Sequence, residues 1–362
     1  MLALSSAALL AGCAWASAAS QPNPVVTLAP GQITPIPTAL PGLTGPNQFP
    51  PGVNPLTGLP ADPAALARRP LLVQISNAPP MVRPQAGLGA ADVVFEYSVE
   101  GGLTRFSAIY LSQLPERIGS IRSARLMTDQ LVPMFGAVLA YSGASEGVTA
   151  ILHSADYAAR TFSNMQLDEP FFWRDLTIEP PHNLFINAAA LVSAFPAESA
   201  GPSDLRGWAF RAEPPPNPAG PASFASISYP MSGAAWQYDP ASGLYVRSSD
   251  GLLHSDANTG QPITAANVII LEAPHALSGI VESEWQGQPV YGLDIDLMAG
   301  GEALLLRDGL AFAARWSRPA RDGLFRLTTP DGAILPLKPG VTFVQVFPPA
   351  AGRIASEAVV VQ

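Results

Sequence analysis

The stretch RPQAGLGAADVVFEYSVEGGLTRFSAIYL, residues 83–111, decides the fold. It contains two short runs rich in β-branched and aromatic residues, 92–97 and 105–111, and each run predicts a strand. The glycine pair Gly101-Gly102 lies between the runs and indicates a hairpin-like connection. We therefore expect an antiparallel strand pair within the first folded segment.

The sequence on both sides of this pair predicts further strands and several helices. Apolar runs at 71–75 and 137–141 are typical of buried strands. The segments 123–135, 147–153 and 187–195 are predicted to be helices, with Ser123 as the N-cap of the first. Strands mixed with helices at this spacing indicate an α/β or α+β domain, with a mixed sheet and flanking helices, over residues 54–195.

The second half of the chain has a different pattern, with short alternating runs separated by turn signals. We expect strands at 224–229, 243–247, 268–272, 291–297, 303–307, 310–316, 324–328 and 342–346. This pattern predicts a β-rich domain over 223–362, either a sandwich or a partly open barrel. Residues 196–222 are rich in Pro and Gly and are predicted to connect the two domains.

The first 53 residues have the pattern of an export signal followed by a tether. Residues 1–13 are apolar and end in Leu10-Ala11-Gly12-Cys13, which resembles the lipobox of bacterial lipoproteins, where the cysteine receives a lipid. No Lys or Arg precedes the apolar run, so we expect the natural start to lie upstream. Residues 14–53 are Pro-rich and uncharged, which predicts a disordered tether. The alternatives are an ordinary buried cysteine and a tether that lies against the folded part.

Composition excludes several classes of protein. The net charge of −9 and the absence of any basic run argue against a nucleic-acid partner. A single cysteine excludes a disulfide framework and a cysteine-based metal site. We find no metal-ligand spacing and no cofactor motif, so neither a metal nor a cofactor is predicted.

Several longer motifs resemble one known family. They are NPLTGL (54–59), the stretch 83–106, IGSIRSAR (118–125), PHNLF (181–185) and the terminal block from residue 316. Together they resemble the YerB-like family of bacterial lipoproteins, whose two domains have no assigned function. The resemblance implies an extracytoplasmic protein anchored to the bacterial cell membrane, with a mixed N-terminal domain and a β-rich C-terminal domain.

Charged residues in the N-terminal half interrupt otherwise apolar sequence. The two-residue period of a strand places Glu96 and Glu100 on one face, and we expect Arg105 to return opposite them. Arginine forks suit phosphate or carboxylate, and a glutamate can accept hydroxyl protons, so this pattern predicts an anion or sugar site. A cross-strand ion-pair network is the alternative. The candidate ligand-binding residues are Arg83, Glu96, Glu100, Arg105, Arg122, Ser123, Arg125, His182 and Asn183.

Two parts of this set have their own arguments. Arg122 and Arg125 flank Ser123 at a predicted helix N-terminus, where the helix dipole already favours an anion. His182 and Asn183 lie in a predicted loop, where a polar residue serves either a site or a turn. His153 and Asp156 could join His182 in a metal site or base relay, but their spacing does not indicate it.

Motifs for a catalytic nucleophile are absent, and Ser145, in the turn 143–147, is a weak match. In the second half, Trp316, Arg318, Arg321 and Asp322 could stack on a sugar or fix the last hairpin. Two hypotheses remain. The first is a lipid-anchored envelope protein that binds an anionic ligand, a cell-wall polymer or a protein partner through an Arg-rich cleft. The second is an envelope transferase or hydrolase acting on phosphate-bearing or glycosidic wall polymers.

Overall fold

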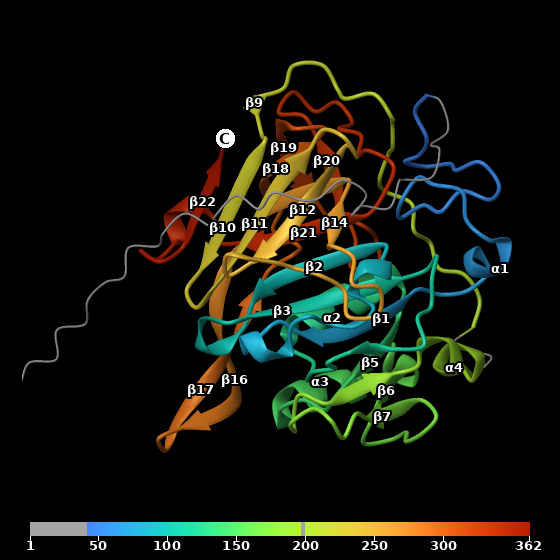
Figure 1. Ribbon diagram of the computed structural model, residues 1–362, viewed down its shortest axis with the longest axis vertical. Coiled ribbons are helices and arrows are strands. Elements are labelled where there is room, and N and C mark those ends of the chain that lie inside the picture. Colours follow the sequence, from blue (N-terminus) through green and yellow to red (C-terminus); the bar gives the residue numbers. More distant parts are fainter. Residues whose placement is uncertain (1–41, 197–199) are drawn as a thin grey trace, which may run out of the picture.

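The computed structural model describes residues 42–196 and 200–362. The predicted signal segment with Cys13, and the predicted tether up to residue 41, lie outside the described residues. The described part contains two large β-sheets, two small ones and four short α-helices (Figure 1).

The largest sheet has eleven strands and runs through the whole molecule (Figure 1). Its order is β20-β19-β18-β15-β21-β2-β3-β1-β5-β6, and β9 pairs with β19. The first half of the chain supplies β1 (Leu71–Ser76), β2 (Val93–Ser98), β3 (Thr104–Tyr110), β5 (Val138–Tyr141) and β6 (Thr161–Ser163). The second half supplies β9 (Gly220–Pro221), β15 (Asn267–Glu272), β18 (Gly301–Arg307), β19 (Leu310–Ser317), β20 (Arg326–Thr328) and β21 (Thr342–Phe347).

The second large sheet has six strands, all from the second half of the chain. They are β10 (Phe224–Tyr229), β11 (Ser232–Asp239), β12 (Leu244–Ser249), β13 (Leu252–Leu253), β14 (Thr264–Ala265) and β22 (Ala358–Val361). The small sheets are the hairpin β16 (His275–Trp285) with β17 (Gln288–Ile295), and the three strands β4 (Ile118–Gly119), β8 (Leu184–Ile186) and β7 (Phe172–Arg174).

The helices are short and lie around the first half of the eleven-stranded sheet. The α-helices are α1 (Pro63–Leu66), α2 (Leu126–Phe135), α3 (Glu146–Ser154) and α4 (Ala188–Ser193). The 3₁₀ turns are η1 (Pro80–Val82), η2 (Leu88–Ala90), η3 (Glu100–Gly102), η4 (Ala158–Arg160) and η6 (Ala350–Gly352). In the described part of the chain, no helix is long and apolar enough to span a bilayer.

Both faces of the eleven-stranded sheet are covered, which gives two hydrophobic cores. On one face, side chains such as Val94 and Phe343 pack with Trp236 and Tyr245 of the six-stranded sheet. On the other face, side chains such as Phe95 pack with α2 and α3. The fold is therefore α+β with a β-rich C-terminal part, which confirms the predicted fold class.

Strand β21 joins the two halves of the chain. It lies in the middle of the sheet, with β15 on one side and β2 on the other, and both pairings are parallel. The predicted segments 54–195 and 223–362 therefore share one sheet instead of having separate ones. Residues 196–222 link them in sequence, and the backbone pairing of β2 with β21 joins them within the sheet.

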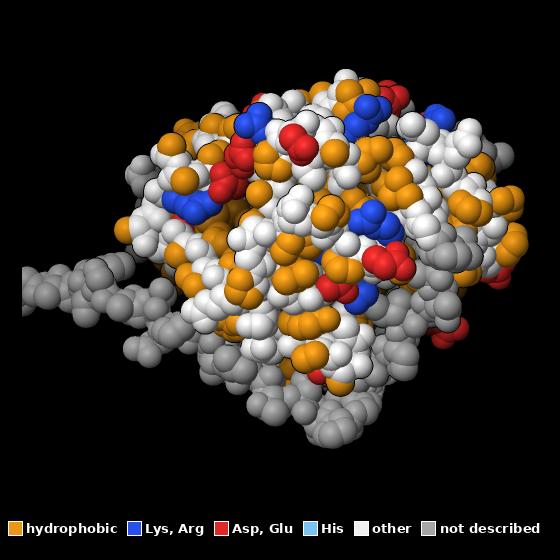
Figure 2. All heavy atoms as spheres, turned by 90° about the horizontal axis from the view of Figure 1, so that it is seen from above, with side chains coloured by type: hydrophobic (Ala, Val, Ile, Leu, Met, Phe, Trp, Pro, Cys, Tyr) orange, Lys and Arg blue, Asp and Glu red, His pale blue; other side chains and the backbone are white. Residues whose placement is uncertain are grey.

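Charged side chains are sparse at the surface, as the composition of 13% charged residues implies. On the face drawn in Figure 2, acidic and basic side chains are scattered in small groups among hydrophobic ones. The predicted arginines therefore do not stand out as one large basic patch on this face.

The tether predicted over residues 14–53 extends too far, because residues 42–53 pack on the folded part. Thr44 exchanges two backbone hydrogen bonds with Phe210, at 2.9 and 2.7 Å. The Phe49 ring lies 6.4 Å from the Phe210 ring, and Val53 is buried. Gly45 has a φ of +81°, and a Cβ there would lie 2.4 Å from the Trp208 carbonyl oxygen.

A chain that begins at Asn54 should consequently be less stable than one that begins at Gly42. Removing residues 42–53 exposes part of Phe210 and Trp208, and burying one large apolar side chain stabilises a protein by about 1.5–3 kcal/mol. We expect the melting temperature to fall by several degrees, and Phe49→Ala in the longer chain to give part of that fall. Equal melting temperatures for the two chains in calorimetry would show that this segment adds nothing.

Candidate functional site

Three arginines from different parts of the first half lie near one another, and we call Arg105, Arg122 and Arg125 the arginine cluster. Arg105 is on β3, opposite Tyr97 of β2. Arg122 follows Ile121, which bridges to Ile75 of β1, and its N–H donates to the Gln74 carbonyl. Arg125 occupies the N-cap position of α2. The helix predicted from Ser123 thus begins three residues later, at Leu126.

Arg125 is the arginine with carboxylate partners. Its Nε donates to Glu100 Oε2 at 2.8 Å, its Nη2 contacts the other oxygen, and Glu282 Oε2 lies 3.5 Å from its Nε. Against the effect of burial, Glu100 raises the pKa of Arg125, and the same hydrogen bonds lower the pKa of Glu100. This pair remains ionised at any physiological pH.

Arg105 has a less favourable environment. Its Nη1 donates to the carbonyl of Ser123 at 2.7 Å, and its buried Nε has no hydrogen-bond acceptor among the described residues. Burial, together with the positive charge of Arg125, lowers the pKa of Arg105 to about 10. Ser123 is therefore not the predicted helix cap. Its backbone carbonyl accepts a hydrogen bond from Arg105 instead.

Arg122 brings His182 into the same region. The guanidinium donates to the Pro181 carbonyl at 3.0 Å and to Ser76 Oγ at 3.3 Å, and its Nη2 contacts His182 Nδ1. Since arginine only donates, Nδ1 accepts, and the proton of the neutral imidazole is on Nε2. Burial and the adjacent Arg122 lower the pKa of His182, which keeps the ring neutral at pH 7.

Other predicted site residues lie elsewhere. Glu96 pairs with Phe106, so its side chain points to the opposite face of the sheet from Arg105. Arg83 pairs with Asp250 at 2.6 Å on that face. Asn183 is buried and accepts a hydrogen bond from Arg174 at 2.8 Å. The predicted set therefore divides into the arginine cluster with Glu100, Ser123 and His182, a separate group with Glu96 and Arg83, and Asn183, which belongs to neither.

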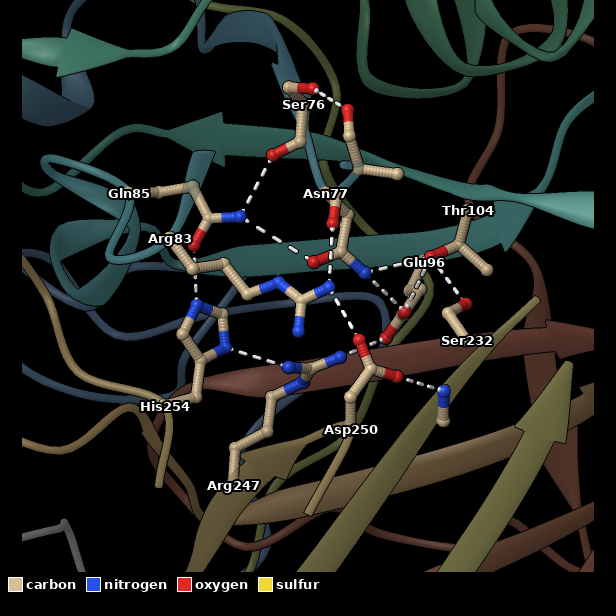
Figure 3. A network of polar contacts seen from close by, with 12 residues as sticks. Ser76, Asn77, Arg83, Gln85, Glu96, Thr104, Ser232, Arg247, Asp250 and His254 are labelled. Atoms are coloured by element: carbon tan, nitrogen blue, oxygen red, sulfur yellow. Dashed lines mark hydrogen bonds and ion pairs between the residues drawn. The ribbon is translucent and has the colours of Figure 1, made fainter. Parts of the chain in front are cut away.

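The group around Glu96 is a buried network between the two large sheets (Figure 3). Arg247 of β12 donates to Glu96 Oε2 at 2.6 Å, and both side chains are almost fully buried, at 0% and 1% exposed. The other Glu96 oxygen accepts from Asn77 and Thr104, each at 2.9 Å. These contacts fix the six-stranded sheet on the eleven-stranded one.

His254 extends this network. Arg247 Nη1 lies 2.7 Å from His254 Nδ1, and His254 Nε2 lies 2.5 Å from Gln85 Oε1. Burial and the neighbouring Arg247 lower the pKa of His254 well below its usual value. The structure thus favours the neutral imidazole. The contacts of this group therefore fit an ion-pair network, the alternative that the sequence leaves open, better than a ligand site.

Replacing Arg247 by methionine should strongly destabilise the protein. The change leaves the Glu96 carboxylate buried without its counter-ion, and breaking a buried ion pair costs about 3–5 kcal/mol. The matched control is Arg206→Met, because Arg206 pairs with Asp204 at the surface, where a pair contributes about 0–1 kcal/mol. Urea unfolding of both variants tests this difference. Similar losses in the two would contradict it.

The free energy of unfolding should also depend on pH through His254. The unfolded chain binds a proton at this residue below about pH 6.5, and the folded protein does not, so stability is full above that pH and falls below it. The limiting slope is about 1.4 kcal/mol per pH unit. His254→Gln should reduce this slope between pH 7 and 5, and the remainder comes from His182 and His275, whose pKa values are also lowered. His153→Gln, at the exposed end of α3, should keep the full slope. An unchanged slope in His254→Gln would assign the effect to other groups.

The other polar groups noted in the sequence make ordinary structural contacts. Asp156 pairs with Arg321 at 3.0 Å, and no group of metal-ligating side chains is found among residues 42–196 and 200–362. Trp316 and Arg318 are buried, and Arg318 donates to the Gln130 carbonyl at 2.9 Å. Neither group therefore gives a second candidate site.

Comparison with known proteins identifies the family of the chain. Residues 56–201 match the model of the N-terminal domain of a protein family of unknown function, DUF3048, and residues 225–344 match its C-terminal domain. The chain belongs to the DUF3048 family. The two family models leave out residues 202–224, much of the segment that links the halves.

Within the DUF3048 family, one relative is the Bacillus subtilis (strain 168) protein named "Putative lipoprotein YerB". The chains are 32% identical over 306 residues, which is 81% of this chain and 86% of the relative. The crystal structure of the YerB protein from Bacillus subtilis superposes with a TM-score of 0.68 at 30% identity, and the match covers 85% of this chain and 99% of that one.

Two charged residues that contact the predicted site residues were not predicted from the sequence. Glu282 contacts Arg125 from β16, a strand that had not been expected because its sequence mixes Gly, Ser and Glu with apolar residues. Arg247 ends the predicted strand 243–247, but its partner lies 151 residues away. The alternation of β12 could have indicated that Arg247 faces inward, though not toward which residue.

Proposed function

We propose that this DUF3048 protein is anchored to the outer face of the bacterial cell membrane by a lipid on Cys13 and binds a phosphate-bearing wall polymer at the arginine cluster. The anchor is supported by the lipobox-like Leu10-Ala11-Gly12-Cys13 and by the name of the relative YerB. The binding site is supported by the side chains around Arg105 and Arg122.

The observation that carries the proposal is a surplus of buried positive charge. Among the described residues, no carboxylate lies within 4.0 Å of the guanidinium of Arg105 or Arg122, whereas Arg125 has two. A partly buried cation without a partner destabilises a fold, so its presence calls for an anion from outside. A guanidinium presents donors in a fixed fork that matches phosphate oxygens.

Two neighbouring residues favour binding over catalysis. The Nε2–H of neutral His182 is a donor beside Arg122 and suits a phosphate oxygen. Ser145, the weak nucleophile candidate, is used as the N-cap of α3, where its Oγ accepts from the Val148 N–H at 3.4 Å. We therefore place the polymer's phosphate between Arg105, Arg122 and His182.

Replacing Arg122 by glutamine should weaken phosphate binding with little effect on stability. Each hydrogen bond to a charged group contributes about 1.5–3 kcal/mol, so we expect the Kd for a glycerol-phosphate oligomer to rise at least about tenfold. Isothermal titration measures the Kd, and calorimetry should place the melting temperature within a few degrees of the parent.

Arg206→Gln is the matched control, because it removes the same charge from an exposed pair. It should leave the Kd unchanged. Equally weak binding in both variants would show that the loss reflects the overall charge of the protein and not the position of Arg122. Binding to phosphatidylglycerol vesicles that depends on Arg122, without binding to the oligomer, would assign the cluster to a lipid headgroup instead.

A further inference from the structure

The hairpin β16–β17 stands apart from both large sheets and projects from the body of the molecule (Figure 1). Its outer side carries exposed apolar residues, with Leu277 at 75% and Trp285 at 70% exposed. Its inner side faces α3 and η3 and presents Ile280 and Glu282. This hairpin therefore lies beside Arg125, one member of the arginine cluster.

Glu282 is the unusual residue on the inner side of the hairpin. Its side chain is only 1% exposed, and neither carboxylate oxygen accepts a hydrogen bond of ordinary geometry from the described residues, although the Ser145 side chain lies close enough to lower its pKa. Its one ion-pair contact is Arg125 Nε at 3.5 Å, and Glu100 already makes two shorter contacts with that arginine. Buried carboxylates are nearly always hydrogen-bonded, so this one requires an explanation.

The surroundings of Glu282 are built for an anion. Arg125 lies on one side, and Ser145, at the N-terminus of α3, lies on another. Gly292 on the neighbouring strand leaves room, because a Cβ there would lie 3.0 Å from Glu282 Oε1. Burial and the nearby Glu100 carboxylate raise the pKa of the Glu282 carboxyl, against the opposing effects of Arg125 and Ser145. Arg125 and Ser145 thus favour an anion at this place, but the Glu282 carboxylate is held there poorly.

The hairpin packs on α3 through Ile280, and an outward movement of the hairpin would break this contact. Ile280 lies against Gly147, where a Cβ would be 2.7 Å from Ile280 Cγ2 and 3.4 Å from Ile280 Cβ. The base of the hairpin is tied to the body by Gln130 of α2, whose Nε2 donates to the Ile295 carbonyl at 3.2 Å. Motion about this base would carry Glu282 away from Arg125 while leaving both large sheets intact.

We propose that the Glu282 carboxylate occupies the seat of a phosphoryl group of the ligand, which binds Arg125 when the hairpin β16–β17 moves outward. This inference rests on the proposed function of the arginine cluster and adds Arg125, Ser145 and the hairpin to its phosphate site. The ligand then carries at least two phosphoryl groups, one near Arg122 and one near Arg125, as a polymer with repeating phosphates does.

The first test removes the competing carboxylate. Glu282→Gln should lower the Kd of the full chain for inorganic phosphate and for the glycerol-phosphate oligomer at least fivefold. Glu284→Gln is the matched control, because it removes the same charge from an exposed residue two positions along the strand. It should change the Kd less than twofold.

The second test locks the hairpin in place. Gly147→Cys with Ile280→Cys places the two Cβ atoms about 3.4 Å apart, close to the roughly 3.5–4.5 Å range of a disulfide. Cys13→Ser in the same chain prevents mispairing. We expect the oxidised protein to bind the oligomer at least tenfold more weakly than the same protein after reduction, which also shows that the variant folds.

Each outcome decides between the two proposals. Equal binding by the oxidised and reduced forms, weaker binding in Glu282→Gln, or equal tightening in Glu284→Gln would overturn the seat at Arg125. If Arg122→Gln then still lost binding, the arginine cluster would stand as the phosphate site. Absence of binding in the parent and in Glu282→Gln alike would overturn both.

Discussion

The buried ion pair between Glu96 and Arg247 is the contact on which the arrangement of the two large sheets depends. It joins strands of different sheets, with the rings of Phe106 and Trp236 beside Arg247 and the polar side chains of the surrounding network hydrogen-bonded to the pair. A charge in such surroundings is tolerated only when it is paired and hydrogen-bonded, so the sheets have one favourable relative position. Packing of apolar side chains alone would specify that position less sharply.

The register of β2 and β3 relates this pair to the arginine cluster. Neighbouring residues of a strand point to opposite faces, so Glu96 faces the six-stranded sheet while Tyr97 and its partner Arg105 face α2 and α3. A shift of one residue would bury Tyr97 at the place of Glu96 and turn Arg105 away from Arg125. The structural network and the proposed site are thus two sides of one strand pair.

The local elements could be predicted from the sequence, whereas most of their partners could not. The apolar runs and the Gly101-Gly102 turn predicted β1, β2 and β3, since these signals lie within a few residues. The face of Arg105 was predicted wrongly, because it depends on the register across η3, which residue types alone do not define. The contact of Arg122 with His182 spans 60 residues, and no local pattern reports it.

The longest-range pairing has a consequence for how the chain is made. Strand β21, residues 342–347, fills the middle of the eleven-stranded sheet, yet it is synthesised after both of its neighbours, β2 and β15. Until it arrives, β2 and β15 each present an open strand edge, which is a ready site for mispairing with another chain. The nascent chain therefore exposes both edges until β21 has emerged. A premature stop before β21 would leave the eleven-stranded sheet divided between β2 and β15.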